Sequence, residues 1–325
     1  MDIPSSWDWS ATQIVHSSWR KILVIGAVDR GKSTYCHFLS QRLLATGATT
    51  AVVDADVGQK DIGPPAAITL GYPQPDVALS QVQPAAWYFV GAVSPAGHLL
   101  PAVLGARQLV DMARASRVII NTTGFVHGLG RVLKGYKIDA VQPDVIVAIA
   151  RGHELSALLT PYRHHRTLRI TPSPRAIVKT PQQRQSNRER AFAAYFASAR
   201  EVSLPWQQVR LQRSLLFTGT RVRHDAFLYA ERTAEGLIAV AAHDIPYSPG
   251  VTVLPAGFEH HLLCGIANQR NHGLGLAILK HLDFAAETLT LLTPIPAEHI
   301  RIIQCGDLYV SPDGRELERR VPRGL

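Results

Sequence analysis

The sequence has few cysteines and no long apolar run. Its three cysteines, Cys36, Cys264 and Cys305, are far apart and form no Cys-x-x-Cys pair, which is typical of a reducing compartment and argues against a zinc site. No stretch approaches the roughly 18 consecutive apolar residues that a membrane-spanning helix needs. The opening residues lack the basic and apolar regions of a secretory signal peptide. We therefore expect a cytoplasmic protein that has no membrane partner.

Acidic residues are fewer than basic ones in this chain of 325 residues. There are 25 aspartates and glutamates against 34 lysines and arginines, which gives a formal net charge of +9. This excess favours a polyanionic partner such as nucleic acid, but an arginine-rich composition alone gives the same balance. Charge therefore leaves the partner open.

The first half of the chain alternates strand-like and helix-like stretches. Apolar, often β-branched runs indicate the strands, and apolar residues at helical spacing indicate the helices. The strands are expected at 21–27, 49–56, 116–124 and 143–150, and the helices at 32–46 and 107–115. Short apolar strands separated by helices are typical of a parallel sheet that is covered on both faces.

The composition changes in the second half. Residues 161–190 contain eight lysines and arginines against the single acid Glu189, together with four prolines, which predicts a basic and partly irregular segment. From about residue 201 the chain consists of short strand-like pieces separated by turns, which indicates a smaller β-rich domain.

A phosphate-binding motif follows the first expected strand. Residues 26–34, GAVDRGKST, fit the pattern G-x-x-x-x-G-K-[ST], with Gly26, Gly31, Lys32 and Ser33 in the defining positions. Consecutive backbone N–H groups of such a loop surround a phosphate, the lysine neutralises the β- and γ-phosphates, and the serine hydroxyl binds Mg²⁺. We expect this protein to bind a nucleoside triphosphate with Mg²⁺.

Two aspartates lie at the end of the second expected strand, in AVVDADVGQ at 51–59. A P-loop site needs a carboxylate near the metal, and strand alternation points Asp54 and Asp56 the same way if the strand continues that far. The alternative is that one of the pair only caps the following loop. A carboxylate here can accept a proton from a hydroxyl or orient a water, and these residues do not choose between phosphoryl transfer and hydrolysis.

The loop and the aspartates, together with NTTGFVHGLG at 121–130, resemble the polynucleotide 5′-hydroxyl kinases of the Clp family. That family has a Walker A loop, a D-V-G-Q element and an N-T-x-G-W-V-x-G stretch, and all three occur here in the same order. The resemblance covers roughly residues 20 to 200 and is weaker afterwards. It implies transfer of the γ-phosphoryl of ATP, or of another nucleoside triphosphate such as GTP, to the 5′-hydroxyl end of RNA or DNA.

The resemblance also implies roles for single residues. Asp56 takes the place of the aspartate that activates the 5′-hydroxyl and supports Mg²⁺, with Gln59 next in the metal shell and Asp54 in support. Phe125 replaces the family's base-stacking tryptophan and keeps an aromatic face on which any base can stack. Without the resemblance, an aromatic residue after a glycine is more often part of a core.

The family has a clasp that meets the nucleotide phosphates and a mobile lid that carries two arginines. GAVSPAGHLL at 91–100 occupies the clasp position, with Ser94 and Gly97 as the expected contacts. Arg184 and Arg188, at i, i+4 spacing, match the lid arginines, which counter charge on the transferring phosphoryl group. An exposed basic helix face is the alternative.

The expected site combines these assignments. Catalysis is assigned to Asp56, Lys32, Arg184 and Arg188. Nucleotide contacts are expected from Gly26, Asp29, Arg30, Gly31, Lys32, Ser33, Thr34, Ser94 and Gly97. Metal ligands are expected among Ser33, Asp54, Asp56 and Gln59, and nucleic-acid contacts among Thr123, Gly124, Phe125 and Arg190.

The resemblance and the element pattern together predict an α/β fold of the P-loop NTPase type, with a parallel sheet, helices on both faces and a smaller C-terminal β-rich domain. The expected boundaries are a short N-terminal extension at 1–20, a P-loop kinase domain at 21–200 with a basic lid segment at about 161–195, and the β-rich domain at 201–325.

Two other function classes stay open. One is an adaptor that binds ATP without turnover as a subunit of an RNA-processing assembly, although the intact loop, aspartates and lid arginines favour activity. The other is a P-loop GTPase or metallochaperone, for which the sequence shows neither a Cys/His ligand cluster nor an N-K-x-D motif. The oligomeric state is not indicated.

Overall fold

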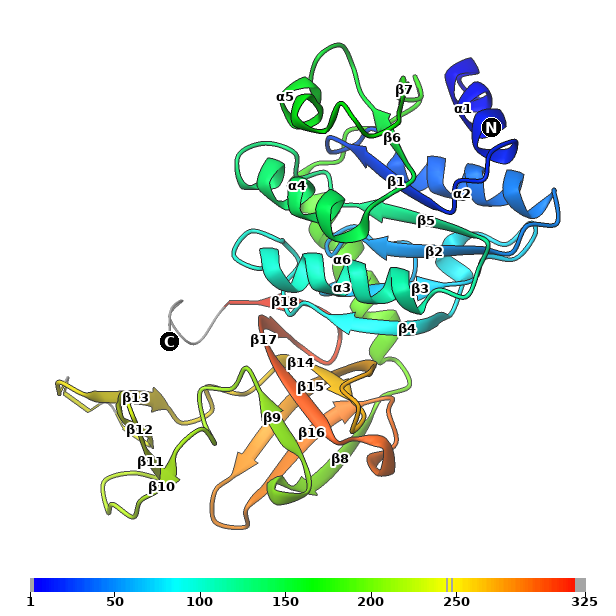
Figure 1. Cartoon of the computed structure of the whole chain (residues 1–325). Helices are drawn as coiled ribbons and strands as arrows, with labels where there is room; N and C mark the ends of the chain where they lie inside the picture. The colour runs from blue at the N-terminus through cyan, green and yellow to red at the C-terminus, as the bar shows by residue number, and fades with distance from the viewer. Residues whose placement is uncertain (1–2, 244, 247, 319–325) are drawn as a thin grey trace. The chain divides into compact units, whose positions relative to one another are not determined.

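The computed structural model describes residues 3–243, 245–246 and 248–318 (Figure 1). The chain divides into two compact units, Met1–Ala191 and Phe192–Leu325. We describe each unit on its own.

The sheet of the first unit has the strand order β4-β3-β2-β5-β1-β6-β7. Its strands are β1 (Lys21–Gly26), β2 (Thr50–Ala55), β3 (Ala67–Gly71), β4 (Pro84–Phe89), β5 (Arg117–Thr122), β6 (Val145–Ile149) and β7 (Thr167–Ile170). The run from β2 to β7 is parallel, whereas β3 is antiparallel to β2 and β4 is antiparallel to β3. The predicted α/β fold is confirmed, with the difference that these two strands are antiparallel.

The helices of the chain are α1 (Ser5–Val15), α2 (Lys32–Leu44), α3 (Leu99–Met112), α4 (Leu129–Val141), α5 (Ser156–Leu159) and α6 (Pro181–Phe196). Short 3₁₀ segments lie at Leu79–Gln81, Thr160–Tyr162, Trp206–Gln208 and Ala297–His299. The helix expected at 107–115 begins earlier, at Leu99, and ends at Met112. Pro101 lies in its first turn, where a missing N–H costs no helical hydrogen bond, so this proline does not stop the helix.

Both faces of the first sheet are covered. Leu23 and Ile25 of β1 pack into an apolar cluster with residues of α3 and α4. Their neighbours Ile22 and Val24 point to the opposite face and pack with residues of α1 and α2. This alternation is the reason why β1 reads as a continuous apolar run in the sequence. It also places the loops after β1, β2 and β5 at one edge of the sheet, since parallel strands end together.

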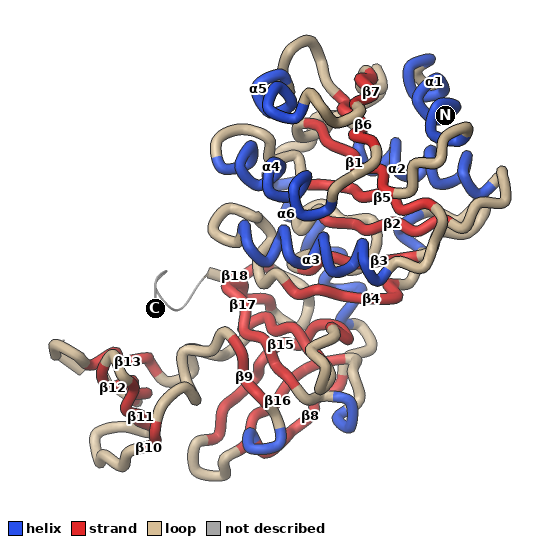
Figure 2. The backbone as a smooth tube through the Cα atoms, viewed as in Figure 1, coloured by secondary structure: helices blue, strands red, loops and turns tan. Residues whose placement is uncertain are grey.

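The second unit consists mainly of strands, shown in red in Figure 2. One group has the order β18-β17-β14-β15-β16-β8, with β9 on β17. Its strands are β8 (Arg200–Pro205), β9 (Arg210–Gln212), β14 (Leu262–Ala267), β15 (Gly273–Asp283), β16 (Thr288–Thr293), β17 (Ile302–Val310) and β18 (Glu316–Leu317). A smaller sheet contains β10 (Thr220–Arg221), β11 (Tyr229–Thr233), β12 (Gly236–Ala241) and β13 (Val251–Pro255). The predicted β-rich C-terminal region is confirmed.

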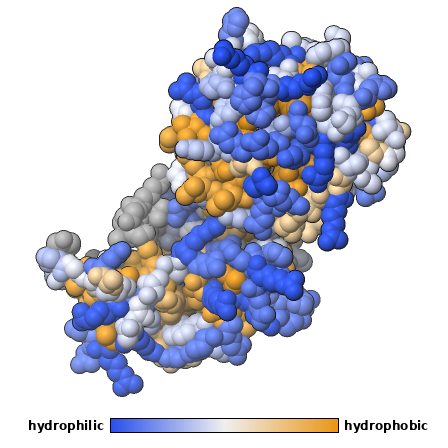
Figure 3. All heavy atoms as spheres, viewed as in Figure 1, coloured by the Kyte–Doolittle hydropathy of each residue, from blue (hydrophilic) through white to orange (hydrophobic). Residues whose placement is uncertain are grey.

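Apolar side chains are exposed on two helices of the first unit. Figure 3 shows hydrophobic atoms gathered over α3 and α4. The exposed apolar residues there include Leu100, Leu104, Leu129, Val132 and Tyr136. Contiguous exposed apolar patches of this kind are typical of interaction surfaces. None of the helices in the described part of the chain has the length and apolar character that a membrane span requires.

Candidate functional site

The loop between β1 and α2 forms the base of the site. Gly31, the residue before α2, has φ 81°, a left-handed conformation that favours glycine. Lys32 is the first residue of the helix and is buried, and its Nζ donates to the carbonyl of Ala27 at 2.9 Å. Burial lowers the pKa of Lys32, and the negative charge of Asp56 opposes this shift. The first N–H groups of α2 have no helical partners, so this end of the helix attracts anions.

Asp54 lies inside the protein, at the end of β2. Its side chain is only 2% exposed. Its two oxygens accept hydrogen bonds from the backbone N–H groups of Asp56 (3.2 Å), Asp61 (2.9 Å) and Ile62 (3.2 Å). The side-chain amide of Asn121 adds a fourth bond at 3.1 Å. Asp54 thus fixes the course of the loop after β2.

Asp56 has a different environment from Asp54. Because β2 ends at Ala55, Asp56 lies in the loop and is half-buried. Its Oδ1 accepts from the backbone N–H groups of Gly58 and Gln59, both at 3.0 Å. Within the described residues, no donor bonds to its Oδ2. One carboxylate oxygen therefore orients the loop while the other is free to bind a ligand.

Two further charged residues of the loop after β2 lie beside Asp54 and Asp56. The ammonium of Lys60 donates to the Asp54 carbonyl at 2.7 Å and lies 3.6 Å from Asp54 Oδ2, with a side chain that is 1% exposed. Burial lowers the pKa of Lys60, and Asp54 opposes the shift. Burial and, next, the charge of Asp54 raise the pKa of Asp61 to about 6. The loop thus presents a third carboxyl group to the site.

The strand β5 joins the aspartates to the phosphate loop. Asn121 pairs in register with Asp54 across β2 and β5, and its amide Nδ2 also donates to the Ser33 hydroxyl at 3.2 Å. Thr123, just after the strand, is buried. A single asparagine therefore holds the serine of the loop and the buried carboxylate at a fixed separation.

The clasp segment packs closely on the loop that follows β2. A Cβ atom at Gly58 would lie 2.7 Å from the carbonyl oxygen of Val93, so only glycine allows this approach. The hydroxyl of Ser94 accepts from the N–H of Ala96 at 3.3 Å. The clasp segment and the loop that carries the D-V-G-Q element are therefore in contact.

The first part of α6 carries the basic side chains assigned to the lid. Arg184 donates to Asp29 Oδ2 at 2.5 Å, and the N–H of Lys179 bonds to the same oxygen at 2.9 Å. The amide of Gln59 donates to the Arg184 carbonyl at 3.1 Å. Arg190 bonds to Ser186 and Asn187 of its own helix. The lid is thus bound on one side to the phosphate loop and on the other to the D-V-G-Q element.

These segments enclose a cavity of about 1070 Å³ within the first unit. The expected site residues that line it are Asp29, Gly31, Lys32, Ser33, Thr34, Asp56, Gln59, Ser94, Thr123, Gly124, Arg184, Arg188 and Arg190. Its volume suits a ligand larger than a single nucleotide phosphate chain.

Five expected site residues do not line the cavity: Gly26, Arg30, Asp54, Gly97 and Phe125. Arg30 forms a paired contact with Glu154, from Nε to Oε1 at 3.0 Å and from an Nη to Oε2 at 2.9 Å. This contact lowers the pKa of the Glu154 carboxyl. Phe125 is half-buried. The roles assigned to these five residues stay predictions.

Two lysines of α4 are fully buried beside the site. The ammonium of Lys134 donates to the carbonyl (2.7 Å) and the hydroxyl (3.0 Å) of Thr123. Burial, and next the charge of Lys137, lowers the pKa of Lys134 well below its usual value. Lys137 Nζ has no hydrogen-bond partner among the described residues, and burial lowers its pKa to about 8 against the opposing charge of Asp56.

The comparison with protein families identifies this arrangement. Residues 26–198 match the family model described as the P-loop of mRNA cleavage and polyadenylation factor CLP1. The chain belongs to the CLP1 P-loop family. The family predicted from the sequence motifs is confirmed, and the matched range contains the phosphate loop, the aspartates, the clasp and the lid.

Relatives of the CLP1 family cover nearly the whole chain. A polyribonucleotide 5′-hydroxyl-kinase of Pyrococcus furiosus is 32% identical over 97% of this chain and 95% of its own length. One of Methanocaldococcus jannaschii is 31% identical over 91% of this chain and 89% of its own. The polyribonucleotide 5′-hydroxyl-kinase Clp1 of Xenopus laevis is 25% identical over 85% of this chain and 67% of its own length.

A solved structure supports the fold. The wild-type Clp1p–Pcf11p complex matches with a TM-score of 0.59 over 93% of this chain and 77% of that chain, at 13% identity. At this identity the similarity concerns the fold alone.

Sequence reasoning missed four charged residues near the CLP1-type site. Lys60 and Asp61 directly follow the D-V-G-Q element, so their closeness to the aspartates was a signal that could have been used. Lys134 and Lys137 were missed because lysine is almost never fully buried, although their spacing was a signal: both fall on the helix face of Leu133, Ile138 and Val141.

Proposed function

We propose that this protein is an ATP-dependent polynucleotide 5′-hydroxyl kinase that phosphorylates the 5′ end of RNA, and also of DNA. The observation that carries the proposal is the cavity in which the phosphate loop, the Asp56 carboxylate and two lid arginines meet. Phosphoryl transfer to a hydroxyl needs these three elements together, namely a phosphate cradle, a proton acceptor and positive charge around the transferring group. The names of the relatives support the same reaction.

The residues of the cavity suit a magnesium–nucleotide complex. Mg²⁺ prefers oxygen ligands and keeps several waters, and the Ser33 hydroxyl, the open Oδ2 of Asp56 and the Gln59 side-chain oxygen are of that type. When bound there, Mg²⁺ would neutralise negative charge on the nucleotide phosphates. We assign Asp54 to the support of this shell and not to direct contact, since four N–H groups occupy its oxygens.

In the proposed mechanism Asp56 accepts the proton of the 5′-hydroxyl as the oxygen attacks the γ-phosphorus in line, the bond from the γ-phosphorus to the β,γ-bridging oxygen breaks, and ADP leaves. Lys32 leaves the Ala27 carbonyl to bind the phosphates, and Arg184 and Arg188 counter the charge that spreads over the transferring group. The basic residues at 161–190 contact the polynucleotide backbone, so binding weakens with salt. Residues 21–200 act as the kinase domain, with the lid at about 161–195, and residues 201–325 as a β-rich domain.

One transfer assay tests this function. The protein is incubated with a 5′-hydroxyl oligoribonucleotide, Mg²⁺ and γ-labelled ATP, and we expect label on the oligonucleotide. Asp56→Asn should abolish transfer while ATP binding persists, because Asn keeps the loop's hydrogen bonds but is not a base. Asp111→Asn, an exposed carboxylate of α3 paired with Arg107, is the matched control and should retain activity. No transfer by the unmodified protein, despite demonstrated ATP binding, would contradict the kinase proposal and favour the adaptor.

A further inference from the structure

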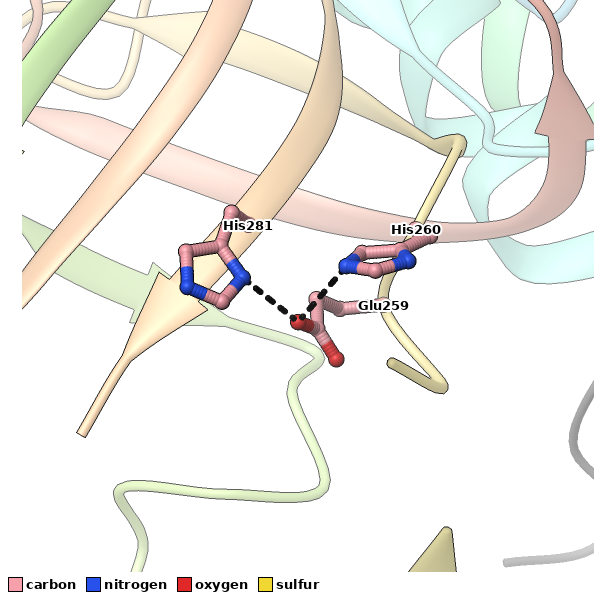
Figure 4. Close-up of side chains that lie close together, drawn as sticks. All are labelled: Glu259, His260 and His281. Carbon is pink, nitrogen blue, oxygen red and sulfur yellow. Dashed lines mark ion pairs between the residues drawn. The ribbon is translucent and has the colours of Figure 1, made fainter. Parts of the chain in front are cut away.

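The second unit contains a cluster of metal-binding side chains that is separate from the kinase site. Glu259, His260 and His281 each offer one ligand atom, and these three atoms lie within 4.8 Å of one another. Figure 4 shows the two imidazole rings on either side of the carboxylate, with His281 from β15 and the other two residues from the turn before β14.

The fold fixes the position of this cluster. The turn is closed by a hydrogen bond from the N–H of Leu262 to the Glu259 carbonyl at 2.9 Å. The backbone N–H of Leu282, next to His281 in β15, donates to Glu259 Oε1 at 3.2 Å. Because β14 and β15 are antiparallel neighbours, the turn and the strand are brought together by sheet pairing although they are far apart in sequence.

The carboxylate of Glu259 is buried without sufficient partners. Its side chain is 1% exposed, and within the described residues its Oε2 has no hydrogen-bond partner. Burying a carboxylate oxygen is costly unless a cation or donor compensates it. The two histidine nitrogens face the other oxygen, Oε1, and a cation bound between them and Oε1 would compensate the charge of this buried carboxylate.

The histidines do not form hydrogen bonds to the Glu259 carboxylate oxygen that they face. His260 Nε2 and His281 Nδ1 lie 3.7 Å and 3.8 Å from Glu259 Oε1, which is beyond hydrogen-bond distance. Two ligands of one tetrahedral zinc ion are about 3.4 Å apart, since zinc binds nitrogen and oxygen at about 2.0–2.2 Å. The side chains of His260 and His281 are 41% and 58% exposed, so the rings have room to turn. Small rotations then bring the three donor atoms to one ion.

We propose that Glu259, His260 and His281 form a binding site for a divalent transition-metal ion of the zinc type. Two imidazoles and one carboxylate suit Zn²⁺ better than Mg²⁺ or Ca²⁺, which prefer oxygen ligands throughout. Three protein ligands leave a fourth position for water. The bound ion joins the turn before β14 to β15 and so stabilises the second unit. This site is independent of the proposed kinase function.

Metal titration of the full-length protein tests the site. After chelation and dialysis, Co²⁺ is added and the visible ligand-field bands are recorded, and Zn²⁺ affinity is measured by calorimetry. We expect one ion with nitrogen ligation, and a rise in melting temperature with Zn²⁺. His281→Gln and Glu259→Gln should each weaken Zn²⁺ binding by more than about 10-fold, since even changes outside the direct ligands cost about 10–100-fold.

Control variants separate this site from others. His272→Gln replaces an exposed histidine of the same unit and should leave the Co²⁺ bands unchanged, as should Asp56→Asn in the kinase site. His281 is exposed, so its substitution leaves the fold intact, and an unchanged circular dichroism spectrum verifies this. The proposal is overturned if no metal binds, or if the bands survive in His281→Gln and disappear in Asp56→Asn.

Discussion

Asp54→Asn is expected to lose stability and Asp56→Asn to lose transfer activity, although only one residue separates the two aspartates. Each oxygen of Asp54 accepts two hydrogen bonds, Oδ1 from the N–H of Asp56 and the amide of Asn121, and Oδ2 from two backbone N–H groups. In the asparagine variant one of these oxygens becomes an NH₂ group that faces at least one backbone N–H donor, whichever way the amide turns. The variant also removes the carboxylate that acts most strongly on the buried ammonium of Lys60.

The expected loss of stability in Asp54→Asn follows from the hydrogen bonds and the ion pair that the substitution removes. Removing one partner of a buried charge pair costs about 3–5 kcal/mol, and the lost charge-assisted hydrogen bonds act in the same direction. We therefore expect Asp54→Asn to lower the free energy of unfolding by about 3–5 kcal/mol. Asp56 is half-buried and accepts only through Oδ1, which an asparagine keeps, so its variant should lose less than about 1 kcal/mol.

Urea unfolding followed by far-ultraviolet circular dichroism measures the difference, in parallel with the labelled transfer assay. The midpoint urea concentration should fall for Asp54→Asn and stay near that of the unmodified protein for Asp56→Asn, with Asp111→Asn as the surface control. If Asp54→Asn unfolds like the unmodified protein while Asp56→Asn is the unstable variant, our division of roles between the two carboxylates is wrong.

Three further outcomes are expected. The pKa of Lys137 is lowered from 10.5 to about 8 by burial, so the unfolded state binds more protons between these values and stability rises with pH in that window. Lys137→Met should thus be more stable than the unmodified protein by about 3 kcal/mol below pH 8. Urea titrations should show that this difference in stability vanishes by about pH 10.5. A difference that is constant with pH would indicate a packing effect instead. Asp29→Asn removes the carboxylate that competes with phosphate for Arg184, so ATP should bind more tightly by about 1 kcal/mol, and fluorescence titration that shows weaker binding would refute this. Phe125→Ala should weaken binding of a 5′-hydroxyl oligonucleotide by about 1–3 kcal/mol without changing ATP affinity, and Phe125→Trp should restore it; an oligonucleotide affinity that is equal in all three proteins would exclude base stacking by Phe125.

The sequence predicted those parts of the site whose residues lie within a few positions of one another. The phosphate loop and the D-V-G-Q element have the backbone that their local sequence requires, because glycines and strand ends determine it. Contacts between distant segments were not accessible in this way. Arg30, expected at the nucleotide, bonds to Glu154. The lysines of α4 were missed because their charge argues against the buried face on which the helical spacing places them.

The same limit applies to the fold. Parallel strands with intervening helices were predicted from periodicity, whereas the antiparallel direction of β3 and β4 follows from sheet pairing that no local pattern encodes. The cluster of Glu259, His260 and His281 is a further case, because the absence of paired cysteines said nothing about a site made of histidine and glutamate. Antiparallel pairing of β14 and β15 creates it from residues that look unrelated in the sequence.

The hydrogen bond between Asp29 and Arg184 has a consequence for how the protein rests between turnovers. An aspartate of the phosphate loop occupies the guanidinium group to which we assign a role in the reaction, and it does so with the same kind of atom, an anionic oxygen, that a phosphate presents. Arrival of a triphosphate therefore exchanges one anion for another at Arg184. Arg184 is therefore already partly removed from water and held in place before the nucleotide binds. The Asp29 carboxylate keeps the first part of α6 ordered in the way that a bound phosphate would.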